Sequence, residues 1–294
     1  MKTVQIVLLA LVTPHAAPGQ TVQRPPITGI AYVRIYAKDP AASRRFYTEE
    51  LRLPAAPCPT EDCTRYQVGA DQFIEVVRTD GQSDGQQLIA FRTTDAEALR
   101  RYLAARKVHV PAVARQRQDG SVEFAVADAE RHGIAFIQLK VPAAERGVIS
   151  HRLIHAGVVV HDRAAMDSLY IGILGFRPYW HGGMKPERTD WVSLQVPDGT
   201  DWLEYMLNVP RNASHHLMGI MNHLALGVED MDSTEAALRR TGWQPHREER
   251  KQMGLDGKYQ LNVFDPDEVR VEFMSFTPSR PPCCSAFTGP HPHP

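Results

Sequence analysis

The sequence has little of what marks several classes of protein. Only four of its 294 residues are cysteines, too few for a disulfide framework. Neither sign of charge is in excess, because 33 Lys and Arg face 34 Asp and Glu, and this balance argues against nucleic-acid binding. No apolar run approaches the ~20 residues that a membrane span needs. The 43% apolar content is enough to bury a core in one large or two ordinary domains.

The N-terminal segment has the pattern of a secretory signal. Lys2 is followed by an apolar run from Val4 to Val12 and then by small residues before Gln20. The alternatives are a cytosolic strand and an anchor at a lipid surface. We favour the signal, exclude residues 1–19 from the fold, and expect a secreted or periplasmic protein.

Export makes disulfides permissible. Cys58 and Cys63 are five residues apart between an expected helix and strand, and a bridge between them is favoured over a zinc pair. Cys283 and Cys284 are adjacent in the Pro-rich tail 280–294, which we expect to be disordered and without a catalytic role.

The strongest pattern is a unit that occurs four times. Each copy begins with a strand-like run ending in an aspartate, which is expected to cap a following helix: Asp39, Asp95, Asp162 and Asp230. Each continues into further strand-like runs, so the unit is one strand, one helix and about three strands. A single unit leaves one apolar face exposed, and the units are therefore expected to pair. This predicts an α+β chain with domains at about 27–146 and 150–279.

Two imidazoles and two carboxylates recur in register within the last two units. His155 precedes Glu204 by 49 residues, and His223 precedes Glu272 by 49 as well. If the two units pair about a pseudo-twofold axis, all four side chains converge on one point. Imidazole and carboxylate ligands suit Zn, Ni, Fe or Mn, so we predict one divalent metal ion at this point. Gly157, on the His155 face of its strand, is expected to leave space for a ligand.

The first two units carry no comparable set. The matching positions are expected to hold Tyr32, Glu75, Leu88 and Gln138, which form a poor set of ligands. We therefore interpret the N-terminal domain as metal-free, with a role in structure, dimerisation or closure of the pocket.

These features resemble the vicinal oxygen chelate superfamily, which includes glyoxalase I, extradiol dioxygenases and bleomycin-binding proteins. The similarity covers about residues 27–279 and is most specific in the C-terminal half. The matching motifs there are His155-x6-Asp162, Leu174-Gly175-Phe176, His223-x6-Asp230 and Phe264-Asp265-Pro266-Asp267 followed by Glu272. The resemblance implies four βαβββ modules, paired into two glyoxalase/dioxygenase-like domains around a cupped metal site.

The resemblance also implies the chemistry. Glyoxalase-like members use four ligands, which His155, Glu204, His223 and Glu272 match, and this favours a lyase or isomerase acting on a small substrate with two vicinal oxygens. The expected reaction passes through a metal-chelated enediolate, with Glu272, or otherwise Glu204, removing a carbon-bound proton. Export argues against glyoxalase I itself.

Two other functions stay open. Extradiol dioxygenases use Fe(II) held by two His and one Glu, together with an acid–base His and Tyr. His181 and Tyr259 lie close enough in sequence to the corresponding positions that this activity stays an alternative. A small-molecule binding protein without enzymatic activity is the third reading. For any of them, Trp202, Met206, His181 and Tyr259 are the expected substrate contacts, and a homodimer is an open prospect.

Overall fold

The four aspartates each cap a helix, as the repeated unit predicts. Asp39, Asp95, Asp162 and Asp230 all accept backbone N–H groups from the first turn of the helix that follows. This contact satisfies donors that the helix itself leaves unpaired. The computed structural model describes residues 22–58, 62–81, 86–140, 145–185, 187–245 and 250–294; the predicted signal lies outside the described residues.

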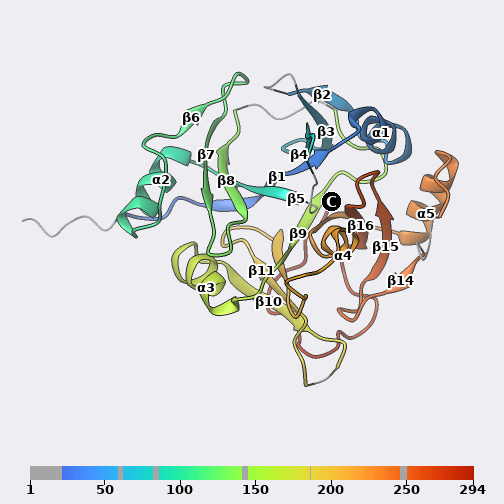
Figure 1. Ribbon diagram of the computed structural model, residues 1–294. Coiled ribbons are helices and arrows are strands. Elements are labelled where there is room, and N and C mark those ends of the chain that lie inside the picture. The colour runs from blue at the N-terminus through green and yellow to red at the C-terminus, as the bar shows by residue number, and fades with distance from the viewer. Residues whose placement is uncertain (1–21, 59–61, 82–85, 141–144, 186, 246–249) are drawn as a thin grey trace, which may run out of the picture.

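The N-terminal half forms one curled sheet of eight strands with two helical segments (Figure 1). Its elements are β1 (Ile27–Ala37), α1 (Pro40–Arg45), the π-helical turn η1 (Phe46–Glu50), β2 (Ala55–Pro57), β3 (Cys63–Gly69), β4 (Gln72–Arg78), β5 (Gln86–Thr93), α2 (Ala96–Ala105), β6 (Arg115–Gln116), β7 (Val122–Ala127) and β8 (Gly133–Gln138). The strand order is β2-β3-β4-β1-β5-β8-β7-β6.

The C-terminal half repeats this arrangement. Its elements are β9 (Leu153–Val159), α3 (Arg163–Asp167), the π-helical turn η2 (Ser168–Ile173), β10 (Arg177–Gly182), β11 (Trp191–Gln195), β12 (Trp202–Met206), α4 (His215–Met221), β13 (His223–Val228), α5 (Met231–Arg240), β14 (Gln252–Met253), β15 (Tyr259–Phe264) and β16 (Arg270–Ser275). The order β10-β11-β12-β9-β13-β16-β15-β14 is that of the first sheet. The predicted α+β class with four βαβββ modules is confirmed.

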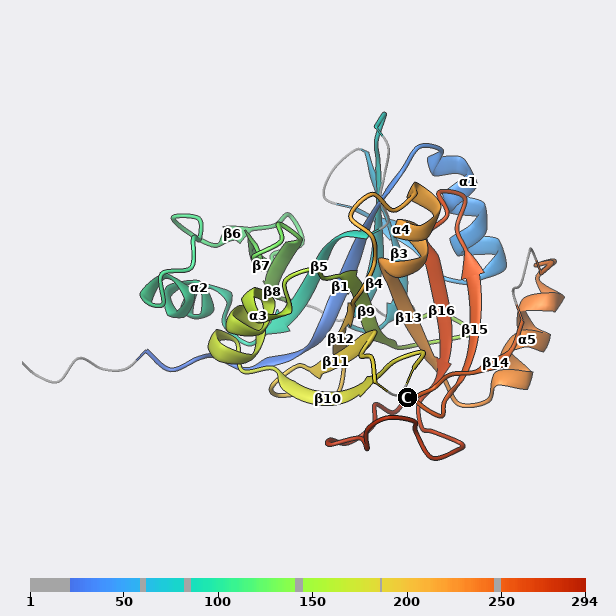
Figure 2. The same ribbon diagram turned by 60° about the horizontal axis from the view of Figure 1, so that its bottom comes forward.

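The helices of the two sheets meet each other between the halves. Helix α2 lies beside α3 and η2, and α1 with η1 lies beside α5 (Figures 1 and 2). The Tyr102 hydroxyl donates to the Ile173 carbonyl at 2.8 Å, and the Thr241 hydroxyl donates to that of Glu50 at 3.0 Å. One apolar core spans both halves, which leaves the inner surface of each curled sheet to form a cup.

Buried polar contacts also join the two sheets. The Asp201 carboxylate, fully buried in the C-terminal half, accepts the Ile30 backbone N–H at 2.9 Å. Gln72 pairs with the backbone of Leu153 through both ends of its amide, at 2.7 and 2.9 Å. Unmade hydrogen bonds at such depth cost about 1–3 kcal/mol each, so these contacts fix how the halves meet.

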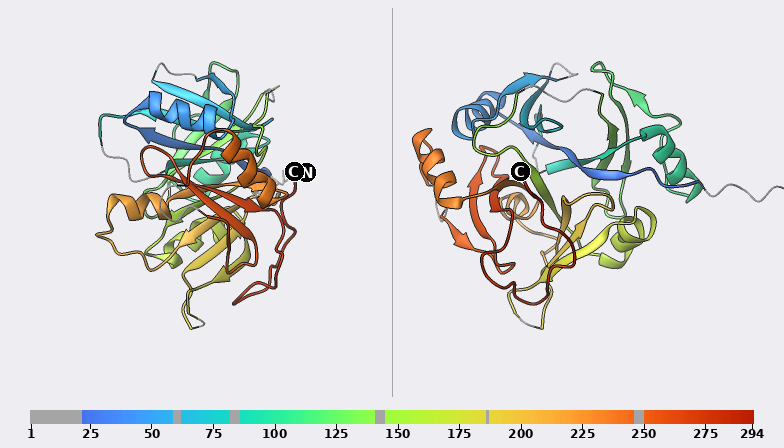
Figure 3. Two further views of the ribbon diagram at one scale, coloured as in Figure 1. Left: turned by 90° about the vertical axis from the view of Figure 1, so that its right-hand side faces the viewer. Right: turned by 180° about the vertical axis from the view of Figure 1, so that it is seen from behind.

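The C-terminal tail differs from the expectation of disorder. Residues beyond Arg280 run along the free edge of β10 and reach the turn between β14 and β15, where the Cys283 N–H donates to the Leu255 carbonyl at 2.7 Å (Figures 2 and 3). The Phe287 ring packs on Tyr179 at 4.8 Å between centroids, and the Gln195 amide donates to the Pro290 carbonyl at 2.7 Å. Buried aromatic area and hydrogen bonds to a strand edge offset the ordering entropy of this segment.

Both cysteine pairs are disulfides. Cys58 and Cys63 are joined, as favoured from their spacing, and the adjacent Cys283 and Cys284 are joined as well, which the sequence analysis did not predict. In the described part of the chain, no helix is long and apolar enough to cross a bilayer.

Candidate metal centre

The four predicted ligands converge inside the cup of the second sheet. His155 on β9 and His223 on β13 place their Nε2 atoms 3.0 Å apart. Glu272 on β16 brings Oε2 within 3.5 Å of the first of these nitrogens and 3.6 Å of the second. Glu204 on β12 brings Oε2 within 3.9 and 3.5 Å of the same two atoms. The equal spacing in sequence becomes convergence because β12 pairs parallel to β9 and β16 pairs parallel to β13.

The imidazoles are oriented as metal ligands. His223 Nδ1 lies 2.9 Å from the Met221 carbonyl, which fixes the proton on Nδ1 and leaves the Nε2 lone pair facing the cluster. The His155 ring stacks on Trp202, with 4.6 Å between centroids and an interplanar angle of 29°. Two nitrogen lone pairs and a carboxylate that face one point in a buried site form a donor set suited to a divalent cation. His155, His223 and Glu272 make up the tightest group of three.

The charge states of these groups also fit a metal site. Burial and the charge of Arg270 lower the pKa of His223, so its imidazole is neutral near pH 7. Burial raises the pKa of Glu272, but the contact with His155 and the charge of Arg270 outweigh this and bring it to about 2. For Glu204 the contact with His223 likewise outweighs burial and lowers the pKa. Both carboxylates are therefore ionised and ready to coordinate.

The expected role of Gly157 differs in the structure. A Cβ atom at this position would lie only 2.2 Å from Cε1 of His223. The space left by the missing side chain is thus filled by the second imidazole rather than by a ligand. The glycine allows the two histidines of the antiparallel β9–β13 pair to approach each other.

A cavity of about 450 Å³ opens above the two glutamates. Its ionisable lining is Glu204, Glu272, Asp256 and Arg270, while its apolar walls come from Trp180, Trp191, Met184, Met206, Met253 and Met274. This volume lies in the range of small-molecule sites. An Arg270 Nε atom that is buried without a hydrogen-bond partner among the described residues places a cation next to the cluster.

The predicted substrate contacts divide into two groups. Met206 lines the cavity, and Trp202 lies behind His155 as its stacking partner. His181 is exposed on β10, where its neighbour Trp180 takes the inward position. Tyr259 packs against the apolar core and does not line the cavity. Neither His181 nor Tyr259 therefore lines this cavity, because strand alternation turns the side chains of adjacent residues to opposite faces.

Two buried ionisable groups near the cluster are not among the predicted site residues. Asp256 lies at the cavity wall, and burial raises its pKa to about 6. Lys258, two residues on, is fully buried with Nζ 4.6 Å from the centre of the Trp202 ring, and burial lowers its pKa to about 8. The pattern Gly-x-Asp-Gly-Lys reads as an ordinary turn, so no signal in the sequence placed these two groups near the metal cluster.

The first sheet lacks this constellation among its described residues. Strands β1 and β4 of the first sheet correspond to β9 and β12 of the second. In the first sheet Tyr32 pairs with Phe73 and Arg34 with Glu75. In the second sheet His155 pairs with Trp202 and Gly157 with Glu204, in the same register. Glu75 is therefore the counterpart of Glu204, as predicted. Ala90 is the counterpart of Ala225, because Tyr32 pairs with Ala90 as His155 pairs with Ala225. Ala90 pairs with Ala135, and Ala225 pairs with Glu272. The counterpart of Glu272 is therefore Ala135 rather than Gln138. Gln138 instead accepts the Ala96 N–H at 3.3 Å, at the start of α2.

Comparison with known proteins agrees with this architecture. Residues 152–273 match the family model described as Glyoxalase/Bleomycin resistance protein/Dioxygenase superfamily. No curated protein sequence matches the chain.

Among solved structures, the chain is similar to homoprotocatechuate 2,3-dioxygenase from Brevibacterium fuscum in complex with 3,4-dihydroxyphenylacetate. That match has 18% identity and a TM-score of 0.65, and covers 92% of this chain and 85% of the other. The enzyme of the same name from Arthrobacter globiformis matches with 19% identity and a TM-score of 0.66 over 88% and 82% of the two chains. These structures share the two-domain fold, and the family match covers the half that holds the His–Glu cluster. We conclude that residues 152–273 form a domain of the Glyoxalase/Bleomycin resistance protein/Dioxygenase superfamily.

Proposed function

We propose that the chain is a divalent-metal-dependent enzyme that moves a carbon-bound proton in a small substrate carrying two vicinal oxygens. The observation that carries this proposal is Glu204, whose carboxylate stands within 3.5 and 3.9 Å of both imidazole nitrogens. Together with His155, His223 and Glu272 it makes a four-residue set, and one carboxylate of such a set can serve as a base. This favours lyase or isomerase chemistry.

The two glutamates differ in their freedom to move. Glu272 has a side chain only 3% exposed, whereas that of Glu204 is 13% exposed. Apart from the imidazoles, Glu204 has a weak contact with the Ser193 hydroxyl at 3.4 Å. Glu204 is therefore the carboxylate that turns toward a substrate proton, and Glu272 is the one that stays in the cluster. A bound divalent metal would polarise the substrate oxygens.

The cavity indicates the substrate class. Its aromatic and thioether walls suit an apolar body, and Arg270 supplies a cation on the side of the cluster. A guanidinium group binds carboxylates with fixed geometry. We infer a small organic acid with an apolar portion and two adjacent oxygens.

A second candidate is an Fe(II)-dependent extradiol-type dioxygenase. Two observations favour it: the likeness of the fold to ring-cleaving dioxygenases and the tight group of His155, His223 and Glu272, which is the two-histidine, one-carboxylate set of non-haem iron oxygenases. Asp256, with a pKa raised to about 6 by burial, is an acid–base group at the wall of the same cavity.

One set of measurements separates the two activities. Protein stripped of metal is reloaded with Fe(II), Mn(II), Ni(II) or Zn(II) and given either catechols, 3,4-dihydroxyphenylacetate included, or hydroxy-ketones and keto-acids in D2O. The proposal predicts exchange of a carbon-bound proton seen by NMR, with no oxygen uptake. Oxygen consumption that requires Fe(II) and a catechol establishes the second candidate instead.

The matched variants sharpen this test. Glu204→Gln keeps the shape of the side chain and removes the base, so exchange is expected to fall about 100-fold or more. Glu229→Gln, at an exposed position in the same domain, is the control. Exchange that survives Glu204→Gln unchanged contradicts the role given to this residue, and protein that retains no metal at all favours the binding-protein reading.

We also propose that the chain is exported. The N-terminal pattern of Lys2, an apolar run and small residues supports this, and both cysteine pairs form disulfides, which persist in oxidising compartments. Determination of the N-terminus of the mature protein tests it. A mature chain that retains residues 1–19 contradicts the proposal.

A further inference from the structure

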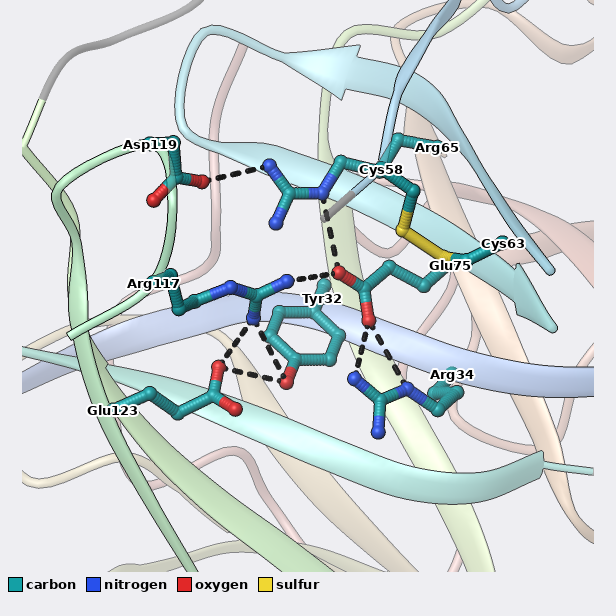
Figure 4. The surroundings of a disulfide bond; sticks show 9 residues. All are labelled: Tyr32, Arg34, Cys58, Cys63, Arg65, Glu75, Arg117, Asp119 and Glu123. Carbon is teal, nitrogen blue, oxygen red and sulfur yellow. Dashed lines mark hydrogen bonds and ion pairs between the residues drawn. A yellow bond between two sulfur atoms is a disulfide. The ribbon is translucent and has the colours of Figure 1, made fainter. Parts of the chain in front are cut away.

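The cup of the first sheet contains a cavity of its own, of about 380 Å³. Its lining includes Arg34, Arg115, Arg117, Tyr36, Val77 and the Cys58–Cys63 disulfide. Figure 4 shows Arg34, Arg117 and the disulfide of this lining. Glu75, the counterpart of the metal-site residue Glu204, forms part of its wall. The position that holds the metal cluster in one half of the chain is thus a charged cavity in the other half.

Three guanidinium groups surround Glu75 where a metal ion would be expected. Figure 4 shows Arg34, Arg65 and Arg117 all directed at its fully buried carboxylate, with ion-pair distances of 2.6, 3.1 and 2.5 Å. Burial raises the pKa of Glu75, but the charges of Arg117 and Arg34 outweigh this and lower it. Although Glu75 lies near both cysteine sulfurs, the disulfide and the guanidinium groups exclude a cation there.

The arginines of this cavity retain hydrogen-bond donors after their internal contacts are made. Arg34 uses Nε and Nη2 for Glu75 and keeps Nη1 unused among the described residues. Arg115 is exposed and forms no ion pair in the described part of the chain. Arg117 is paired with both Glu75 and Glu123.

The balance of charge at the cavity is positive. Three arginines line it, Arg34, Arg115 and Arg117, against two carboxylates, Glu75 and Glu123. The excess is one positive charge. The remaining wall is mixed: Tyr36, Val77 and the disulfide contribute apolar surface, and Gln116 and Gln118 contribute amides.

We propose that this cavity is a binding site for a small organic monocarboxylate, held by Arg34 Nη1 and Arg115 with its apolar body against Tyr36, Val77 and the disulfide. A guanidinium pair matches the geometry of a carboxylate, and the ligand's single charge balances the excess of the cavity. The volume of about 380 Å³ accommodates a ligand of one ring. This site is separate from the metal cluster, and its occupation does not depend on the activity proposed above.

The test uses benzoate as the probe and calorimetric titration of the full-length protein in EDTA, so that the metal site does not contribute. Benzyl alcohol and benzylamine have the same ring without the negative charge. Benzoate is expected to bind at one site per chain, at least about tenfold more tightly than either analogue, because only the carboxylate forms charge-assisted hydrogen bonds with the guanidinium groups.

Two exposed arginines of the same domain provide the matched variants. Arg115→Gln removes a proposed contact without disturbing the buried network and is expected to weaken benzoate binding about tenfold. Arg101→Gln, on helix α2 and outside the cavity, is expected to leave it unchanged. The proposal is overturned if Arg115→Gln binds benzoate as the parent does, if benzyl alcohol binds equally well, or if inorganic phosphate binds more tightly than benzoate.

Discussion

The close approach of Gly157 to the second imidazole makes Gly157→Ala a direct test of the metal cluster. A Cβ atom there would lie 2.2 Å from Cε1 and 2.3 Å from Nδ1 of His223, whereas ordinary contacts are 3.4–4 Å. The ring must therefore move by about 1 Å or more, although it is fully buried and held by the Met221 carbonyl. Metal–ligand distances tolerate only about 0.2 Å.

Two consequences of this substitution can be measured. Overpacking of a buried site is expected to cost about 1–3 kcal/mol of folding free energy in the metal-free protein. Displacement of one ligand is expected to lower metal affinity about 100-fold, at the upper end of what disturbance of a ligand's supporting contacts costs. The parent protein at 100 times its Kd for metal gains about 2.7 kcal/mol of stability, and the variant loses most of that gain.

The assay is thermal unfolding with and without metal, together with elemental analysis and competition against a chelating dye. Gly172→Ala is the control, because the nearest atom to its Cβ, the Asp167 carbonyl oxygen, is 3.8 Å away. It is expected to leave metal binding unchanged. If Gly157→Ala retains parental metal affinity, the cluster of His155 and His223 is not where the metal binds.

Three further predictions concern the second half of the chain. Glu272→Gln is expected to lose both metal and turnover, whereas Glu204→Gln retains metal; elemental analysis of both variants, with Glu229→Gln as control, distinguishes the two roles. Burial lowers the pKa of Lys258 to about 8, below the ~10.4 of lysine in an unfolded chain. Between these two values the unfolded state binds one proton more than the folded state. The free energy of unfolding should therefore rise by up to about 3 kcal/mol from pH 8 to 10.5. Lys258→Met should abolish this rise in denaturant titrations, and an unchanged pH profile would contradict the assignment. Removal of residues 281–294 uncovers Tyr179 and Trp180 and should lower the unfolding temperature; an unaltered temperature would show that the tail contributes no stability.

The sequence was sufficient to predict the features that depend on local rules or on exact repetition. Helix capping by Asp162 and Asp230 follows from contacts within one turn of the helix, so it is visible in the sequence. The convergence of His155 and Glu272 follows from equal spacing in two units that pair in the same register. The first prediction needed no knowledge of distant contacts, and the second needed only the assumption that the two units pair symmetrically.

The features that were missed depend on register and on contacts between distant segments. Gln138 was matched to Glu272 because it is the polar residue in the last apolar run of its unit, but strand pairing places Ala135 there. His181 faces outward on a strand whose register shifts between Pro178 and Trp180, and such an irregularity has no clear mark in the sequence. The tail is ordered by Phe287 packing against Tyr179, more than 100 residues away.

The buried contacts of Asp201 and Gln72 have a consequence for how this protein can be divided. Asp201 accepts a backbone N–H from Ile30, and Gln72 bonds the backbone of Leu153. A fragment cut near residue 150 would leave Oδ2 of Asp201 without its partners from the N-terminal half, although Oδ1 keeps the Arg152 ion pair at 2.7 Å, and it would expose apolar core surface. The two halves have the same strand order, yet each supplies buried contacts that the other needs to fold. Recombinant work on the histidine-bearing half should therefore start from co-expression of both fragments.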